Sequence, residues 1–149
     1  MSRTPRASRH RSREAALQVL YALDLAHRDG SDPARAAAEA FESASENFEL
    51  PEGARAFAKE LIAGVTERRS ELDRVLAAHA RNWRLSRMAT VDRNVLRLAV
   101  FELLHSVTPA PVVIDEAVEL ARRFGAERPP AFVNGILDAV AHAVRPEGA

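Results

Sequence analysis

The sequence predicts an all-α protein, and three observations support this fold class. Hydrophobic residues make up 47% of the 149 residues, whereas aromatic residues make up only 5%. Much of this apolar content is alanine and leucine, which favours closely packed helices over strands. Apolar residues also recur with the helical period along most of the chain. Finally, residues 90–105 are apolar around most of a helix circumference, which is typical of a central buried helix. We therefore expect a compact bundle of about seven helices.

The segment Thr90–His105 is the expected central helix of this bundle. Its run of apolar residues is interrupted by Asp92, Arg93, Arg97 and Glu102, so it is too short and too charged to cross a membrane. A buried strand is the alternative interpretation of the apolar run. The length of the segment, its leucine and alanine content and Thr90 as an N-cap favour a helix.

The other expected helices follow from apolar periodicity and from their end signals. Pro33 suits the first position of a helix, and Gly125 is placed to follow the last residue of another. Pro109 and Pro111 predict a rigid loop, because each disfavours helix in the residue before it. The expected ranges are about 9–27, 33–47, 52–68, 71–80, 112–124 and 130–144.

Length and composition indicate one helical domain, residues 9–146, preceded by a basic arm and followed by a short tail. Residues 1–8 are short, polar and interrupted by proline, so we expect a disordered arm, and residues 147–149 form the tail. The chain has no cysteine, which excludes disulfides and a cysteine nucleophile. No apolar stretch is long enough for a membrane span, and no signal peptide is evident, so we expect a cytoplasmic protein without a membrane partner.

The sequence does not predict catalysis, a metal or a cofactor. The five histidines lie far apart, with none of the spacings known for zinc ligands. The glycine-rich phosphate-binding motifs and the nucleophile motif of hydrolases are absent. Acid pairs such as Asp115–Glu116 are adjacent in sequence and point in different directions on a helix, so they cannot share a proton.

The N-terminal arginines are the strongest candidate for binding. Residues 1–13 contain five arginines and no acid, and the run R-H-R-S-R places Arg9 and Arg13 on one helix face with Arg11 to the side. Guanidinium groups can span several phosphates and stack on unpaired bases. The alternative is a solvated basic helix end. Tyr21, about two turns beyond Arg13, is able to stack on a base, although a single aromatic residue in an apolar stripe more often belongs to the core.

Two further features leave alternatives open. The arginines between residues 81 and 97 flank Trp83, and we favour salt bridges to the acidic second helix over nucleic-acid binding for this cluster. Asn134 and Gly135 interrupt the last apolar helix. A glycine there costs about 1 kcal/mol relative to alanine, so we expect a close approach of backbone or ligand.

A joint pattern is carried by five segments: R-H-R-S-R-E-A-A-L-Q-V-L-Y (9–21), A-G-V (63–65), V-L-R-L-A-V-F-E-L (95–103), V-V-I-D-E-A-V-E-L-A-R-R-F-G (112–125) and F-V-N-G-I-L-D (132–138). Together and in this order they resemble the NusB family of bacterial transcription antitermination factors. The resemblance spans nearly the whole chain, with only a loose match in residues 29–49.

The resemblance implies an all-α fold of two packed three-helix subdomains plus an extra helix. It also implies binding of the single-stranded RNA element boxA together with NusE, a small-subunit ribosomal protein. The pair would join RNA polymerase with other Nus factors and suppress termination in ribosomal RNA operons. The family's RNA-binding positions fall on seven residues here: Arg9, His10, Arg11, Arg13, Tyr21, Phe132 and Asn134.

Three departures and two alternative functions accompany the resemblance. Asp115 stands where the family usually has asparagine, Arg128-Pro129-Pro130 replaces a more polar stretch, and His10 replaces a more basic residue. A related helical domain precedes the catalytic part of ribosomal RNA cytosine methyltransferases, but that enzyme class requires a cysteine. A helical adaptor that binds only proteins is the other alternative. Because the family includes monomers and dimers, a homodimer is left open.

Overall fold

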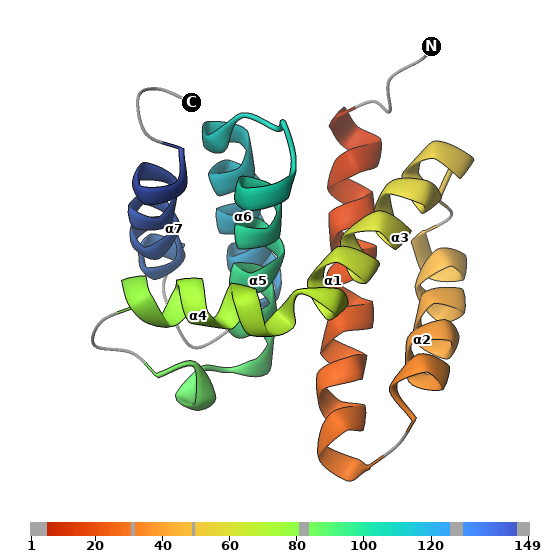
Figure 1. Cartoon of the computed structure of the whole chain (residues 1–149). Helices are drawn as coiled ribbons and strands as arrows, with labels where there is room; N and C mark the ends of the chain where they lie inside the picture. Colours follow the sequence, from red (N-terminus) through yellow and green to blue (C-terminus); the bar gives the residue numbers. More distant parts are fainter. Residues whose placement is uncertain (1–5, 31, 49, 81–83, 126–129, 146–149) are drawn as a thin grey trace. The chain divides into compact units, whose positions relative to one another are not determined.

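The computed structural model describes residues 6–30, 32–48, 50–80, 84–125 and 130–145 (Figure 1). Within these ranges the chain forms seven α-helices and one short 3-10 helix, η1, and contains no strand. This confirms the all-α prediction. The elements are α1 (Arg6–Asp29), α2 (Pro33–Phe48), α3 (Glu52–Glu67), α4 (Arg69–His79), η1 (Leu85–Arg87), α5 (Thr90–His105), α6 (Ala110–Phe124) and α7 (Pro130–Val144).

Several helix ends differ from the expected ranges. The helix α1 begins at Arg6, so residues 6–8 of the expected disordered arm are helical, and residues 1–5 lie outside the described residues. The helix α6 begins at Ala110, and Pro111 therefore lies in its first turn rather than in a loop. Proline is tolerated there because the first turn has no intrahelical acceptor for its missing N–H. Thr90 is not the N-cap of α5 as expected, because it already lies inside the helix, and Ala89 is the capping residue.

The chain forms two compact units, Met1–Thr66 and Glu67–Ala149. In the first unit, α1 and α2 lie side by side and are joined through Gly30, whose positive φ of 81° favours glycine (Figure 1). The expected apolar face of α1 is buried, including Ala16, Val19 and Leu20. Leu25 lies beside this face on α1, but its side chain is exposed.

A buried hydrogen bond ties α1 to α3 within the first unit. The Ser12 hydroxyl oxygen lies 2.8 Å from the backbone carbonyl oxygen of Ala54 and 2.9 Å from that of Ser8, so its one proton is shared between the two carbonyls. Ala15 and Ala54 are both fully buried. Small side chains at these positions therefore let a serine of one helix reach the backbone of the other.

The second unit is built around α5, which contacts α4, α6 and α7. Every residue from Asp92 to Leu103 is buried, as the apolar circumference of this segment predicts. The boundaries also agree with the prediction, since α5 runs from Thr90 to His105.

Charged side chains on α5 are buried as well, and two of its arginines have partners in neighbouring elements of the second unit. Arg97 forms a two-pronged ion pair with Asp73 of α4, with N–O distances of 2.7 and 3.0 Å, and also donates to the Asn94 side chain. Arg93 donates to the backbone carbonyl of Leu85 over 3.0 Å. Within the second unit, α4 and the η1 turn thus provide partners for these two arginines, and the expected pairing with the acidic second helix stays a prediction.

Gly125 follows α6 without adopting the left-handed conformation expected of it, since its φ is −79°. A side chain at this position would instead collide with the carboxylate of Asp92 and the carbonyl of Ala121. Glycine is therefore required by the close approach of Asp92, a fully buried residue near the start of α5.

Arg145 holds the C-terminal end of α5. Its guanidinium group donates to the backbone carbonyls of Glu102, Leu103, Ser106 and Thr108, at distances between 2.5 and 3.0 Å. The last carbonyls of a helix lack intrahelical donors, and a cation is favourable beside them. A residue just beyond α7 thus completes the central helix.

Arg145→Ala should destabilise the protein by about 1.5 to 3 kcal/mol, because the charge-assisted hydrogen bonds to the α5 carbonyls are lost. Urea unfolding followed by circular dichroism measures the change. Arg122→Ala is the matched control: among the described residues Arg122 pairs with the exposed Glu119 on its own helix, so a loss below about 1 kcal/mol is expected. Equal losses of unfolding free energy in the two variants would contradict a stabilising role of Arg145 at the end of α5.

An ion pair near the surface links α4 and α5. The Nε2 atom of His105 lies 2.7 Å from Oε1 of Glu71. The hydrogen bond from His105 lowers the pKa of Glu71 below its ordinary value of 4.5, and the charges of His105, Arg68 and Arg74 act in the same direction. Because the folded-state pKa is the lower one, this carboxylate stabilises the fold above its unfolded pKa, and the contribution is lost as the pH falls through the folded value.

His105→Ala should therefore raise the pKa of Glu71 toward its ordinary value, as measured by a carboxyl-carbon NMR titration. The matched control is His142→Ala, which removes a histidine that contacts Asp138 on α7 and should leave Glu71 unchanged. A Glu71 titration that is identical in wild type and His105→Ala would show that the histidine is not the cause.

Candidate nucleic-acid interface

The arginine-rich segment lies inside α1 rather than at a frayed end. Because the helix begins at Arg6, Arg9 lies in the first helical turns and Arg13 a turn further on. Arg11 is exposed, and Arg9 and His10 are half-buried. Arg13 is only 2% exposed. The alternative of a solvated basic helix end therefore does not apply to Arg13.

Two arginines of α1 contact an aromatic ring of α3. The guanidinium carbon of Arg9 lies 4.6 Å from the ring centroid of Phe57, and that of Arg13 lies 5.4 Å from it. Both distances are within the range of cation–π attraction. His10 lies 3.8 Å from the Glu14 carboxylate, one turn along the same helix. Sequence reasoning missed Phe57, because the segment around it shows only an ordinary apolar stripe.

Tyr21 is also on α1, and 39% of its surface is exposed. Its place in an apolar stripe made a core position the more common interpretation, but the ring is accessible from solvent. Arg9, His10, Arg11, Arg13 and Tyr21 therefore lie along one helix of the first unit.

The remaining two candidates lie on α7, in the second unit. Phe132 is half-buried and Asn134 is exposed. Gly135 next to them is also exposed, and a Cβ atom added there would meet nothing within 4 Å. The close approach expected at this glycine is therefore not made by any described residue.

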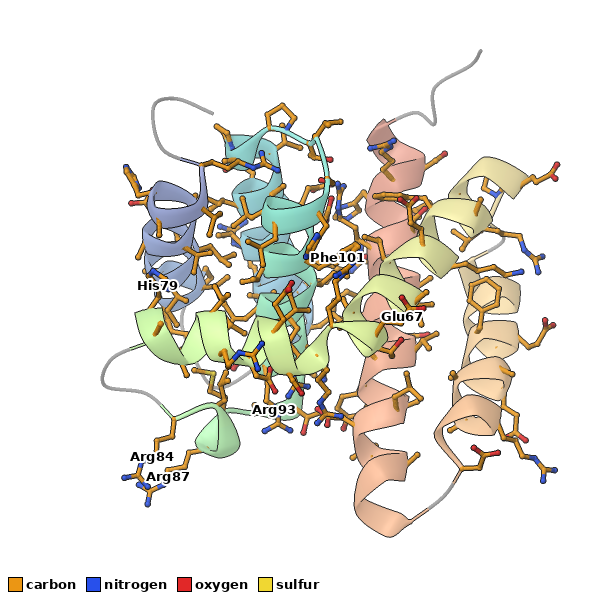
Figure 2. The ribbon with its side chains drawn as sticks, in the orientation of Figure 1. Glu67, His79, Arg84, Arg87, Arg93 and Phe101 are labelled. Carbon is orange, nitrogen blue, oxygen red and sulfur yellow. The ribbon has the colours of Figure 1, made fainter. Side chains whose placement is uncertain are left out.

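The second basic cluster divides into buried and exposed members. Arg93 and Arg97 are buried and engaged within the second unit, whereas Arg84 and Arg87 are exposed beside η1. In Figure 2 both exposed side chains extend away from the helices, and neither forms an ion pair with another described residue. The salt bridges expected for this cluster thus fail for Arg84 and Arg87. Arg81 and Trp83 lie outside the described residues.

The described part of the chain contains no group of three or more potential metal-ligating side chains. Nor does it contain a helix whose length and apolar character would suit a membrane span. The candidate residues on α1 and those on α7 are arginines, accessible aromatic rings and an amide, which are groups that recognise phosphates and bases.

Comparison with known proteins identifies the family. The model of the NusB family matches residues 10–142. The transcription antitermination protein NusB of Anaeromyxobacter dehalogenans (strain 2CP-1) is 47% identical over 139 residues, which cover 93% of each chain.

Solved structures agree with this assignment. A structure of T. maritima NusB is 34% identical, with a TM-score of 0.77 over 99% of this chain and 96% of that one. A crystal structure of antitermination factors NusB and NusE in complex with dsRNA contains a chain that is 31% identical, with a TM-score of 0.77 over 93% of this chain and 99% of that one. The family consists of transcription antitermination proteins and not of enzymes. This chain belongs to the NusB family.

Proposed function

We propose that this antitermination protein binds single-stranded boxA RNA together with NusE and supports transcription of ribosomal RNA operons. The observation that carries the proposal is the basic surface of α1, where Arg11 is exposed and Arg9 is half-buried, in a chain of the NusB family. The solved relative that is described in complex with NusE and dsRNA supports both partners. In the cytoplasm, the complex would join RNA polymerase with other Nus factors.

The burial of each candidate suggests its role. Arg9 and Arg11 contact phosphates, because a guanidinium group offers several donors in a fixed planar fork. His10 adds charge to this surface when it is protonated. Arg13 is too buried for direct contact and supports its neighbours instead. Tyr21 offers a ring for base stacking, and Phe132 and Asn134 supply a ring and a hydrogen-bonding amide on α7.

The first test is a binding titration of the full chain with a boxA oligonucleotide, with and without NusE. Binding alone should be weak, because one short basic segment makes few phosphate contacts. NusE should tighten it, since two components that bind RNA together raise each other's affinity. A duplex of the same sequence distinguishes single-strand from double-strand preference. Binding of NusE without any RNA affinity would instead indicate a protein-only adaptor.

The second test compares the α1 arginines with the exposed arginines beside η1 as candidates for phosphate contacts. Arg9→Ala/Arg11→Ala should reduce the slope of log affinity against log salt by about 1.4, at roughly 0.7 per lost phosphate contact on a single strand. The matched control, Arg84→Ala/Arg87→Ala, removes the same charge from the exposed η1 region and should leave the slope unchanged. If the control lowers the slope and the α1 variant does not, the RNA site lies near η1.

A further inference from the structure

Phe57 of α3 contacts two arginines that belong to a different helix. The rings and guanidinium groups lie 4.6 Å apart for Arg9 and 5.4 Å apart for Arg13. The phenylalanine is half-buried, while its neighbours Ala54 and Ala58 on α3 are fully buried. Phe57 therefore lies at the edge of the core, where one helix meets the basic segment of another.

Two like charges one helical turn apart repel each other, and a free arginine side chain samples many rotamers. Both effects oppose a fixed arrangement of Arg9 and Arg13 on an isolated helix. An aromatic face carries partial negative charge and attracts a cation placed over it. A single ring that contacts both guanidinium groups offsets their repulsion and restricts both side chains.

The position of the ring relative to α1 is fixed independently. The buried hydrogen bond from Ser12 to the Ala54 carbonyl, 2.8 Å long, joins the two helices one turn before Phe57. Ser12 itself lies between the two arginines in sequence. The register of α1 on α3 thus places Arg9 and Arg13 over the ring.

We propose that Phe57 is a positioning residue for RNA binding, which acts by holding Arg9 ready for a phosphate contact with Arg13 as the buried anchor. The proposal rests on the proposed function of the α1 surface. Pre-ordering raises affinity because a side chain that is already restricted loses less entropy when the ligand binds. Phe57 restricts the Arg9 side chain in this way without contacting the RNA itself.

The first unit provides a matched control for the ring. Phe41 of α2 lies 5.8 Å from Arg55 and 5.2 Å from Lys59, both on α3. This is a second aromatic ring with two cations, in the same unit, but it involves no residue of the α1 basic segment. A change in ring electrostatics at Phe41 should therefore not change the positions of Arg9 and Arg13 in the α1 basic segment.

The experiment replaces Phe57 by phenylalanine analogues with increasing numbers of ring fluorines, which keep the ring shape and progressively weaken its negative face. Binding of the boxA oligonucleotide, with NusE present, should weaken in steps to about 2- to 10-fold for the fully fluorinated ring, the cost of ordering one long side chain on binding. The same analogues at Phe41 should leave RNA affinity unchanged. In an Arg9→Ala background, fluorination at Phe57 should have no further effect, because the two changes remove one coupled interaction.

NMR of the RNA-free protein tests the contact separately. The side-chain protons of Arg9 and Arg13 should show ring-current shifts that Phe57→Leu removes and Phe57→Tyr retains. RNA binding that is equal for all analogues at Phe57, or absent ring-current shifts, overturns the positioning role while leaving the proposed function intact. Absence of RNA binding by the unmodified protein with NusE overturns the proposed function and the role of Phe57 together, even if the ring-current shifts are present.

Discussion

The second unit depends on the burial of α5 on all sides, including its charged residues. A buried guanidinium or carboxylate is costly unless hydrogen bonds replace the water that it loses. Arg97 meets this requirement through the two oxygens of Asp73 and the amide of Asn94. An apolar helix alone could rotate or slide among its neighbours. The ion pair to α4 gives α5 one preferred register, because another register would leave a buried charge without its partner.

Backbone carbonyls at both ends of α5 also need hydrogen-bond donors in place of water. Arg93 binds the carbonyl of Leu85, so the chain before the helix is attached to the helix itself. At the other end, the backbone carbonyls of Glu102, Leu103 and Ser106 accept hydrogen bonds from Arg145. The central helix is thus bound at its start through its own Arg93 and at its end through Arg145, which follows α7.

The sequence predicted the helices better than it predicted the partners of long side chains. The run of apolar residues predicted the extent of α5 closely, although Thr90 begins the helix instead of capping it, because apolar periodicity can be read from one continuous segment. The pairing of Arg97 with Asp73, and of Arg9 with Phe57, depends on which helices meet in space. Periodicity does not contain that information, since an arginine can reach partners in many directions. Leu25 shows the converse, because an apolar residue beside a buried stripe remained exposed.

Gly125 links two positions that are far apart in the sequence. The space that a methyl group would need is taken by the Asp92 carboxylate, so the two sites share a single small volume. Evolution at one position is consequently constrained by the other. An alanine at residue 125 would have to displace the carboxylate of residue 92 and would also collide with the Ala121 carbonyl, so we expect residue 125 to stay glycine in relatives with an aspartate at residue 92.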